Sequence, residues 1–566
     1  MQFALRGAMK TTFTLAFASV LLLASCNTEN KRTEKESDST TTETEKKEKK
    51  LSKRDYSISG TNAYNNLFLD SMTMEDYMSK NNFDKSLSRR MRSFYNTRNY
   101  EFAWFSPNGL TQQAFGFWSL KNYSGDTASK SKDFRSRMES LMADTGLSVQ
   151  GTDKSIINTE LRLTQYLIDY TKNNYEKGYV KRKEVERFVP FKKVDPIYIA
   201  DSLLNKKHND DKYFADVNTA YSLLKDQLQK YLAIAKHGGW PSIAGDSKKY
   251  KEGNESPAIL NMKKMLFVMG DLPQTDTTFA FNDNLKEGIK NFQRRFGYTP
   301  DGVVSSSLLR EMNVPAIDRV KQILINMDRM RWMPQEPDGK LMLVNIPEFV
   351  LHVYEGKSKV FDMPVVVGKE GHNTTIFSDK LTTIVFSPYW NVPSSIVKKE
   401  ILPSMAKDPN YLASHNMEQY GGTSELPEIR QKPGEDNSLG KVKFLFPNSF
   451  NIYFHDTPAK SLFSKDQRAY SHGCIRLSDP VKLADYLLKD DSKWTPDKID
   501  EAMNSAEEKY VNVGKAVPVF ITYYTTWVDD AGQLNFRNDI YGHDKEIAGK
   551  MFGQMNGNAN QQLGSL

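Results

Sequence analysis

The chain has 566 residues, too many for a single hydrophobic core, and this length predicts three or four domains. Its net charge of +7 comes from 77 basic and 70 acidic residues that are spread along the sequence, without the concentrated lysine and arginine blocks of a nucleic-acid-binding protein. The rest of the composition is that of a globular protein rich in aromatic residues, so nucleic acid is not expected as a partner.

The first 25 residues have the pattern of an export signal. Arg6 and Lys10 precede the apolar run FTLAFASVLLLA, which is too short for a membrane-spanning helix and is followed at once by polar sequence. The run continues into LASC, which resembles a bacterial lipobox. This resemblance implies cleavage before Cys26, a lipid on its thiol and attachment to a membrane. The alternative is an ordinary secretion signal with an incidental cysteine.

Residues 26–55 are expected to form a disordered tether. After Cys26 no aliphatic or aromatic residue occurs until Leu51, so the segment cannot bury apolar surface to offset the entropy of ordering. If Cys26 carries lipid, Cys474 is the one cysteine that remains and has no partner within the chain. A single unpaired thiol in an exported protein suggests that this thiol has a function.

Residues 60–236 predict a helical scaffold domain, because apolar residues recur three or four apart in segments such as SLSRRMRSFYNTRNYEFAW. Its aromatic side chains, among them Phe94, Tyr95, Trp104 and Trp118, are expected in the core. The glycines and the proline of KHGGWPSI mark the end of this domain.

Residues 238–316 predict a small helical unit. Its second half places Ile289, Phe292 and Phe296 on one helix face, and a Pro-Asp-Gly turn then leads to a short last helix. The pattern resembles the small three-helix peptidoglycan-binding module at Phe292, Gln293, Gly297, Asp301, Gly302 and Leu308. Ser305 and Ser307 stand where that family often has Gly and Thr, so the resemblance implies the fold more firmly than carbohydrate binding.

Residues 317–545 predict a mainly β domain. Past a connecting helix, DRVKQILINMDRMRWMP, the apolar period changes to two, and the domain ends in a hairpin. Within it, residues 396–440 form a polar insertion with a short helix, which is a candidate lid. Residues 546–566 are expected to be a flexible tail. The expected fold class is therefore multidomain α+β, with a helical N-terminal scaffold, a small three-helix module and a mainly β domain with an inserted lid.

The stretch HDTPAKSLFSKDQRAYSHGCIRLSD surrounds Cys474 with groups that can activate a thiol. A thiol attacks as the thiolate, so it needs a base within hydrogen-bond reach. His455 ends a strand-like run 19 residues before Cys474, a gap that suffices for one connection back to the side of that strand. His472 lies two residues before Cys474, on the same face of an extended segment. Two imidazoles and one thiol can therefore converge.

The residues that flank Cys474 fit such a site. Gly473 lets the backbone approach a substrate, and the N–H groups of Gly473 and Cys474 could point at a developing oxyanion. Downstream, Ser478 or Asp479 can cap a helix whose first turn suits Pro480. The site is thus expected between a strand and a capped helix.

These residues resemble the signature of L,D-transpeptidases with a YkuD-type catalytic domain, a histidine followed after a gap by Ser/Thr-His-Gly-Cys. The resemblance implies that Cys474 is the nucleophile and His455 its general base. It also implies that His472 shapes the site, that Gly473 is an oxyanion donor and that Ser471 binds substrate. Many members have Asn two residues after the cysteine.

This chain has Arg476 at that position, as the long multidomain YcbB-like branch does, and a guanidinium there could grip a stem-peptide carboxylate through paired hydrogen bonds. The resemblance continues through LVNIPEF, VVVGK and FSPYWNVPSSIVKKEILP, and it covers most of residues 317–545. It implies that Tyr389, Trp390 and Asn391 line the substrate groove, although Trp390 also suits a core position. The helical scaffold is similar to the one found ahead of the catalytic domain in this branch, in its Phe-Tyr pair followed by Trp.

Other interpretations of the histidines and the thiol remain open. His455, His472 and Cys474 are also zinc-ligand types, but no further Cys/His cluster or zinc-protease motif accompanies them, and no metal is expected. The remaining histidines are expected at the surface or in packing positions: His208, His237, His352, His372, His415 and His543.

The resemblance implies a lipid-anchored enzyme, without a cofactor, that acts on peptidoglycan stem peptides and glycan to form 3→3 cross-links through a cysteine thioester. Water could resolve the same thioester, which would make the protein an L,D-carboxypeptidase or a cross-link hydrolase. A non-catalytic peptidoglycan-binding lipoprotein is a third possibility. Asn27 follows the lipobox cysteine in place of the Asp that retains some lipoproteins in the inner membrane, which favours the outer membrane and a periplasm-facing location. The sequence does not identify protein partners.

Overall fold

The computed structural model describes residues 51–124, 132–144, 146–174, 189–190, 192–205, 219–274 and 276–553. The expected signal peptide, Cys26 and most of the expected tether lie outside these residues, as does His208. In the described part of the chain, no helix is both long and apolar enough to cross a membrane.

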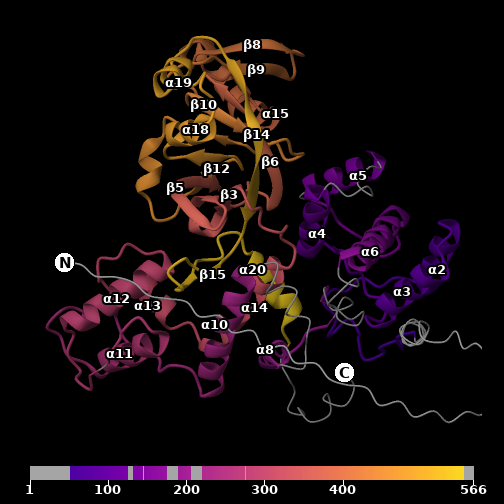
Figure 1. The fold of residues 1–566 in the computed structure, drawn as a ribbon, viewed down its shortest axis with the longest axis vertical. Coiled ribbons are helices and arrows are strands. Elements are labelled where there is room, and N and C mark those ends of the chain that lie inside the picture. Colours follow the sequence, from indigo (N-terminus) through magenta and orange to yellow (C-terminus); the bar gives the residue numbers. More distant parts are fainter. Residues whose placement is uncertain are drawn as a thin grey trace, which may run out of the picture. The chain divides into compact units, whose positions relative to one another are not determined.

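The helical region begins where side chains cap the first turns. Asp70, Asp84, Thr111 and Asp195 each accept a hydrogen bond from a backbone N–H of the helix that follows. The elements are α2 (Ser71–Lys80), α3 (Lys85–Asn96), β1 (Phe105–Ser106), β2 (Gly109–Leu110), α4 (Gln112–Tyr123), α5 (Lys132–Ala143), α6 (Lys154–Asn174), α8 (Pro196–Leu204) and α10 (Thr219–Lys236) (Figure 1).

The predicted aromatic core of this region is confirmed. Phe94, Tyr95, Trp104 and Trp118 are all buried, and the polar atoms of Tyr95 and Trp104 both hydrogen-bond to Thr164. Buried Tyr and Trp side chains generally need such partners for their O–H and N–H groups. These residues therefore hold the scaffold together and do not form an exposed ligand platform.

The expected tether ends earlier than residue 55. The N–H of Ser52 donates to Ser93 Oγ at 3.2 Å, and the N–H of Asp55 donates to the carbonyl of Asn96 at 2.9 Å. Residues 52–55 are thus bound to α3, and the expectation of disorder is wrong for them because the backbone finds partners that composition does not reveal.

Three helices follow the scaffold: α11 (Pro257–Met269), α12 (Asp283–Phe296) and α13 (Ser306–Met312), after the short 3-10 turn η2 (Ser247–Lys249). Ile289, Phe292 and Phe296 are buried on one face of α12, as predicted. Gln293 donates to Asp301 Oδ1 at 2.7 Å and accepts from the N–H of Gly302 at 2.8 Å. These three residues of the module's signature therefore hold its turn in place.

The connecting helix expected at the start of residues 317–545 is confirmed, but it belongs to the helical core and not to the β domain. Helix α14 (Ala316–Met330) buries Val320, Ile323 and Leu324 in the same core as the scaffold. The hairpin of β15 (Thr526–Val528) and β16 (Leu534–Phe536) also packs there, with the ring of Phe536 stacked 5.0 Å from that of Phe296. Figure 1 shows β15 beside α14, where the chain leaves the large sheet.

The β domain is a nine-stranded sheet in the order β12-β5-β13-β11-β10-β6-β14-β3-β4, and β4 also pairs with β5. This extra pairing closes eight of the strands into a ring. The strands are β3 (Lys340–Asn345), β4 (Val350–Glu355), β5 (Ser358–Gly368), β6 (Phe377–Phe386), β10 (Val442–Leu445), β11 (Phe454–His455), β12 (Ala469–Ser471), β13 (Ile475–Leu477) and β14 (Lys509–Thr522).

Helices and short turns complete the β domain. The 3-10 turns are η3 (Ile346–Glu348) and η5 (Lys460–Ser464), and the helices are α18 (Pro480–Leu488) and α19 (Pro496–Met503). A last helix, α20 (His543–Met551), follows the hairpin and packs on the helical region. The core is formed by the inward residues of the strands, such as Val365, Ile384 and Phe444, with Leu483 of α18 packed against them. As predicted, α18 starts with Pro480 in its first turn and Asp479 as its cap.

The insertion expected as a polar lid is a folded unit that starts at Trp390. It contains β7 (Trp390–Asn391), α15 (Ser394–Ile396), the π-helical turn η4 (Val397–Ile401), α16 (Leu402–Lys407), α17 (Tyr411–Ser414), β8 (Met417–Gly422) and β9 (Pro427–Gln431). Strands β7, β9 and β8 form a separate three-stranded sheet, and Val392, Val397, Ile401 and Ile429 form a core of its own. We call residues 390–431 the lid.

The expected flexible tail begins later than residue 546. Ile547 and Met551 of α20 are 2% and 9% exposed and pack with Tyr64 and Ile325. The expectation is therefore wrong for residues 546–551, because this helix has an apolar face that the helical region covers. Residues 554–566 lie outside the described residues.

Candidate active site

The parallel pairing of β11 with β13 creates the site. His455 lies opposite Arg476 and Phe454 lies opposite Ile475, which confirms that the chain returns beside the strand of His455. Side chains alternate between the two faces of a strand. Phe454 and Ile475 point into the core, where both are fully buried. His455, Cys474 and Arg476 therefore share the opposite face.

Cys474 is a partly exposed thiol in a weakly polar setting. Its S–H donates to the carbonyl of Asn451 at 3.5 Å. Burial raises the pKa of this thiol to about 11, although hydrogen bonds from Tyr453 and the positive charge of Arg476 act in the opposite direction. At neutral pH the sulfur is thus protonated, and it needs a base at the moment of attack.

His455 is buried and oriented by the backbone. Its Nδ1 lies 2.5 Å from the carbonyl oxygen of Asp456, and because a carbonyl can only accept, Nδ1 carries the proton. The lone pair is then on Nε2, the atom that can take a proton from a thiol. Burial, together with Arg476, lowers the pKa of His455 to about 3, so the imidazole is neutral at rest. The structure therefore presents a neutral base and a neutral thiol.

Arg476 is half-buried, and its Nε is buried without a hydrogen-bond partner among the described residues. Burial lowers the pKa of this guanidinium, while the nearby thiol opposes the shift. A buried donor without a partner costs free energy, on the order of 1–3 kcal/mol. Arg476 is therefore ready to bind an anionic group that reaches this face of the sheet.

His472 lies at the contact between the catalytic loop and the lid. Its Nε2 is 3.3 Å from Glu400 Oε1 of the π-helical turn, and its ring is 4.8 Å from that of His372. His372, expected as a surface or packing residue, thus packs against a predicted site residue. The site-shaping role of His472 stays a prediction, and its contact with Glu400 joins the cysteine loop to the lid.

Gly473 has a φ of +115°, a conformation that other residues rarely adopt. A Cβ on this residue would have no neighbour closer than 3.7 Å, so the backbone conformation and not space requires glycine. The N–H of Gly473 donates to Ser471 Oγ at 3.1 Å, and that hydroxyl donates to the carbonyl of Cys474 at 2.5 Å. The N–H of Gly473 would have to leave Ser471 to bind an oxyanion, and the expected oxyanion roles of Gly473 and Cys474 stay predictions.

Tyr389, Trp390 and Asn391 lie at the base of the lid. Trp390 packs against the lid core and pairs with Gln431, and the ring of Tyr389 lies 4.3 Å below the guanidinium of Arg430. Their expected role in lining a substrate groove stays a prediction. Ser471 accepts from the N–H of Gly473 and donates to the carbonyl of Cys474, and its expected contact with substrate stays a prediction.

The sequence interpretation missed Tyr453 and Thr374. Tyr453 hydrogen-bonds to the Cys474 sulfur, and its position two residues before His455 in a strand-like run of the sequence could have indicated that it faces the thiol. Thr374 donates to the carbonyl of Gly473, and nothing in the sequence indicates this contact.

The other histidines have structural surroundings. His352 is buried between Glu348 and Asp362, with contacts of 3.0 and 2.8 Å that raise its pKa to about 9 against the effect of burial. His237 and His415 are exposed. Among the described residues, no three His, Cys, Asp or Glu side chains are grouped as metal ligands.

The pKa of Cys474 predicts an unusual pH dependence for alkylation. In a Cys26→Ala protein, where Cys474 is the one thiol, the rate with iodoacetamide should rise about tenfold per pH unit from pH 7 to beyond pH 9.5, because the thiolate fraction at pH 8 is on the order of 10⁻³. Arg476→Met should lower the rate at each pH and Arg476→Lys should not, since lysine keeps the charge. A plateau near pH 8 would contradict the assigned environment.

Two sequence families match the chain. Residues 339–521 match the L,D-transpeptidase catalytic domain, and residues 89–228 match the scaffold domain. A curated Haemophilus influenzae protein named "Putative L,D-transpeptidase" is 32% identical over 243 residues, which are 40% of this chain and 49% of that protein. The chain thus spans about half the length of this relative.

Solved L,D-transpeptidase structures are also similar, at lower identity. One from Mycobacterium smegmatis is 18% identical with a TM-score of 0.18 and covers 32% of this chain and 58% of its own. One from Stackebrandtia nassauensis is 13% identical with a TM-score of 0.20 and covers 49% of this chain and 97% of its own. The sequence families carry the assignment: residues 339–521 are a YkuD-type L,D-transpeptidase catalytic domain, preceded by a scaffold domain at residues 89–228.

Proposed function

We propose that this protein forms 3→3 cross-links between peptidoglycan stem peptides through a thioester on Cys474. The observation that carries the proposal is the parallel pairing of β11 with β13, which sets the thiol of Cys474, the imidazole of His455 and the guanidinium of Arg476 on one face. These are the three kinds of group that acyl transfer from an anionic peptide requires: a nucleophile, a base and a carboxylate-binding cation.

The first half of the reaction forms the thioester. His455 Nε2 takes the thiol proton while the sulfur of Cys474 attacks the carbonyl carbon of the third stem residue, and a tetrahedral oxyanion develops. When it collapses, the bond to the terminal D-alanine breaks. His455 returns its proton to that leaving amine, so that free D-alanine departs with the charge balance unchanged.

The second half forms the cross-link. The side-chain amine of a diamino acid in another stem attacks the thioester carbonyl, gives its proton to His455 and forms the new amide bond. The sulfur leaves as thiolate and recovers the proton from His455, which restores the resting neutral pair. Arg476, whose Nε has no partner among the described residues, is well suited to hold the terminal carboxylate of the donor stem in the first half, until that carboxylate leaves with D-alanine.

The lid would determine what reaches the thioester. Its Glu400 is in contact with His472, two residues from the nucleophile. Excluding water from a thioester favours attack by an amine over hydrolysis. If the lid fails to exclude water, the same residues would yield an L,D-carboxypeptidase or a cross-link hydrolase.

The function is tested by incubating purified muropeptides with the protein and separating the products by mass spectrometry. Wild-type protein should yield a dimer with a 3→3 bond and free D-alanine, and Cys474→Ala should yield neither. His455→Ala should slow thioester formation by about 10²–10⁴-fold, the usual range for loss of a positioned base. His237→Ala, a change at an exposed histidine, is the matched control and should be neutral. Shortened tripeptides without dimer would favour the hydrolase.

We also propose that a lipid on Cys26 holds the enzyme at the periplasmic face of an envelope membrane, with the outer membrane favoured by Asn27. The composition of the segment after Cys26 predicts a disordered tether, and such a tether would transmit little orientation to a folded domain, so the anchor should not affect the chemistry. Cys26→Ala should move the protein from the membrane to the soluble fraction and leave the rate of dimer formation per molecule within about twofold. If this variant stayed in the membrane fraction, Cys26 would not be the site of the lipid anchor.

A further inference from the structure

Thr374 binds the peptide bond that precedes the nucleophile. The residue lies in the connection between β5 and β6 and is 1% exposed. Its hydroxyl donates to the carbonyl of Gly473 at 2.8 Å and accepts from the N–H of Gly368 at 2.9 Å. Because Gly368 N–H occupies the acceptor side of the oxygen, the hydroxyl proton is directed to Gly473.

This contact sets the direction of the Cys474 N–H. The carbonyl of Gly473 and the N–H of Cys474 belong to one planar peptide unit and point to opposite sides. Holding the carbonyl on Thr374 therefore fixes where the N–H points. A hydrogen bond to the carbonyl also polarises the unit and makes its N–H a stronger donor.

Thr374 is the residue that holds the carbonyl of Gly473. Gly473, at a φ of +115°, has no side chain to restrict its rotation, and its own N–H is already bound to Ser471 Oγ. Ser471 thus holds one side of Gly473 and Thr374 the other. The N–H of Cys474 remains as the donor beside the sulfur, where an oxyanion develops during acyl transfer.

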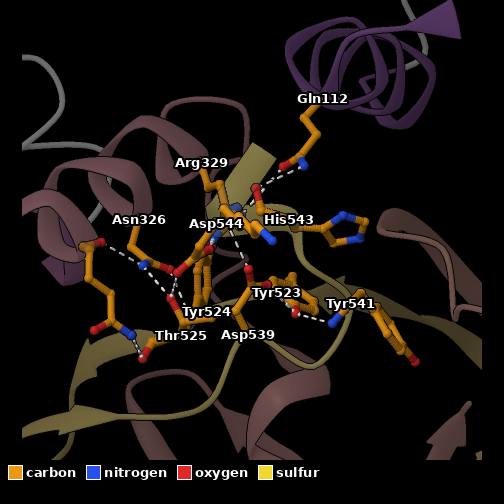
Figure 2. Close-up of polar contacts among 12 residues, drawn as sticks. Gln112, Asn326, Arg329, Tyr523, Tyr524, Thr525, Asp539, Tyr541, His543 and Asp544 are labelled. Carbon is orange, nitrogen blue, oxygen red and sulfur yellow. Dashed lines mark hydrogen bonds and ion pairs between the residues drawn. The ribbon is translucent and has the colours of Figure 1, made fainter. Parts of the chain in front are cut away.

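Tyr541 in turn holds Thr374. The N–H of Thr374 donates to the phenol oxygen of Tyr541 at 3.3 Å, and the phenol donates to the carbonyl of Gly368 at 2.6 Å. The backbone N–H of Tyr541 donates to the hydroxyl of Tyr523 at 2.9 Å, which donates to Asp539 at 2.7 Å (Figure 2). The two tyrosine rings stack with centroids 5.6 Å apart.

The segment of Tyr541 is anchored to the helical region. Asp544 accepts from Arg329 and from Thr525, both at 2.5 Å, and Thr525 accepts from Asn326 at 2.8 Å. Figure 2 shows Asn326 and Arg329 of α14 converging on this segment. The carbonyl of His543 accepts from Gln112 of α4 at 3.3 Å. The backbone of residues 541–544 thus joins polar contacts from two helices to those that reach the loop that binds Gly473.

We infer that Thr374 is a positioning residue for the oxyanion donor of Cys474 and that Tyr541 positions Thr374. The inference rests on the proposed acyl transfer through Cys474. It explains the orientation of the Cys474 N–H by the hydrogen bond from Thr374 to the carbonyl of Gly473. Thr374 acts through the peptide unit and does not contact the substrate. It should affect the stabilisation of the oxyanion and leave the reactivity of the sulfur unchanged.

Thr374→Val tests this inference because valine has the shape of threonine without the hydroxyl. We expect kcat for thioester formation from a tetrapeptide to fall about tenfold to a hundredfold, less than the 10²–10³-fold for loss of a direct oxyanion donor, with KM within about twofold. Thr374→Ser keeps the hydroxyl and should recover most of the rate. Thr375→Val, at the neighbouring threonine, is the matched control and should behave like wild type.

Iodoacetamide alkylation of Cys474 separates positioning from general damage, because this reaction forms no oxyanion. Thr374→Val should alkylate at the wild-type rate. The inference would be overturned if Thr374→Val lost the same factor in thioester formation and in alkylation, or if its thioester formation were unchanged. It would also be overturned if Thr374→Ser did not recover the rate. Tyr541→Phe keeps the ring stacking and gives a second test if the valine variant does not fold, with an expected loss of about threefold to thirtyfold. Absence of thioester in wild-type protein would contradict the proposed function instead.

Discussion

The short parallel ladder between β11 and β13 is the contact on which the site depends. It pairs His455 with Arg476 and sets Phe454 and Ile475 on the opposite face, in the core of the β domain. A shift of the register by one residue would exchange the buried and functional side chains. The apolar residues of these strands therefore fix the position of the chemistry, and the burial of Phe454 and Ile475 contributes to function although neither meets a substrate.

Burial also determines the charge state of the site. It holds the pKa of Cys474 above and that of His455 below the ordinary values, so the two groups are neutral together at physiological pH. A protonated thiol reacts slowly with oxidants and other non-specific electrophiles. In the proposed reaction a thiol held in this way gains selectivity, since the thiolate forms when a substrate is attacked and His455 takes the proton. The positive charge of Arg476 stabilises a thiolate on Cys474 and disfavours a protonated His455, so the two groups do not rest as an ion pair.

Sequence patterns predicted the parts of the structure that depend on local spacing. The gap between His455 and Cys474, the helix that starts at Pro480 and the aromatic core around Trp104 follow from periodicity, capping and burial preferences. Thr374 could not be predicted in the same way, because its partners Gly473 and Tyr541 are 99 and 167 residues away. The extent of α20 was missed for a related reason, since its apolar face is covered by residues such as Tyr64 from the far end of the chain.

Acylation of the protein by a carbapenem, a stem-peptide mimic, tests the central claim most directly, because intact-protein mass records the thioester itself. The account predicts one adduct on wild-type protein, the same adduct on Cys26→Ala, slower formation on His455→Ala and none on Cys474→Ala. An adduct that persists in Cys474→Ala, or that is lost when Cys26 alone is changed, would contradict the assignment of Cys474 as the nucleophile.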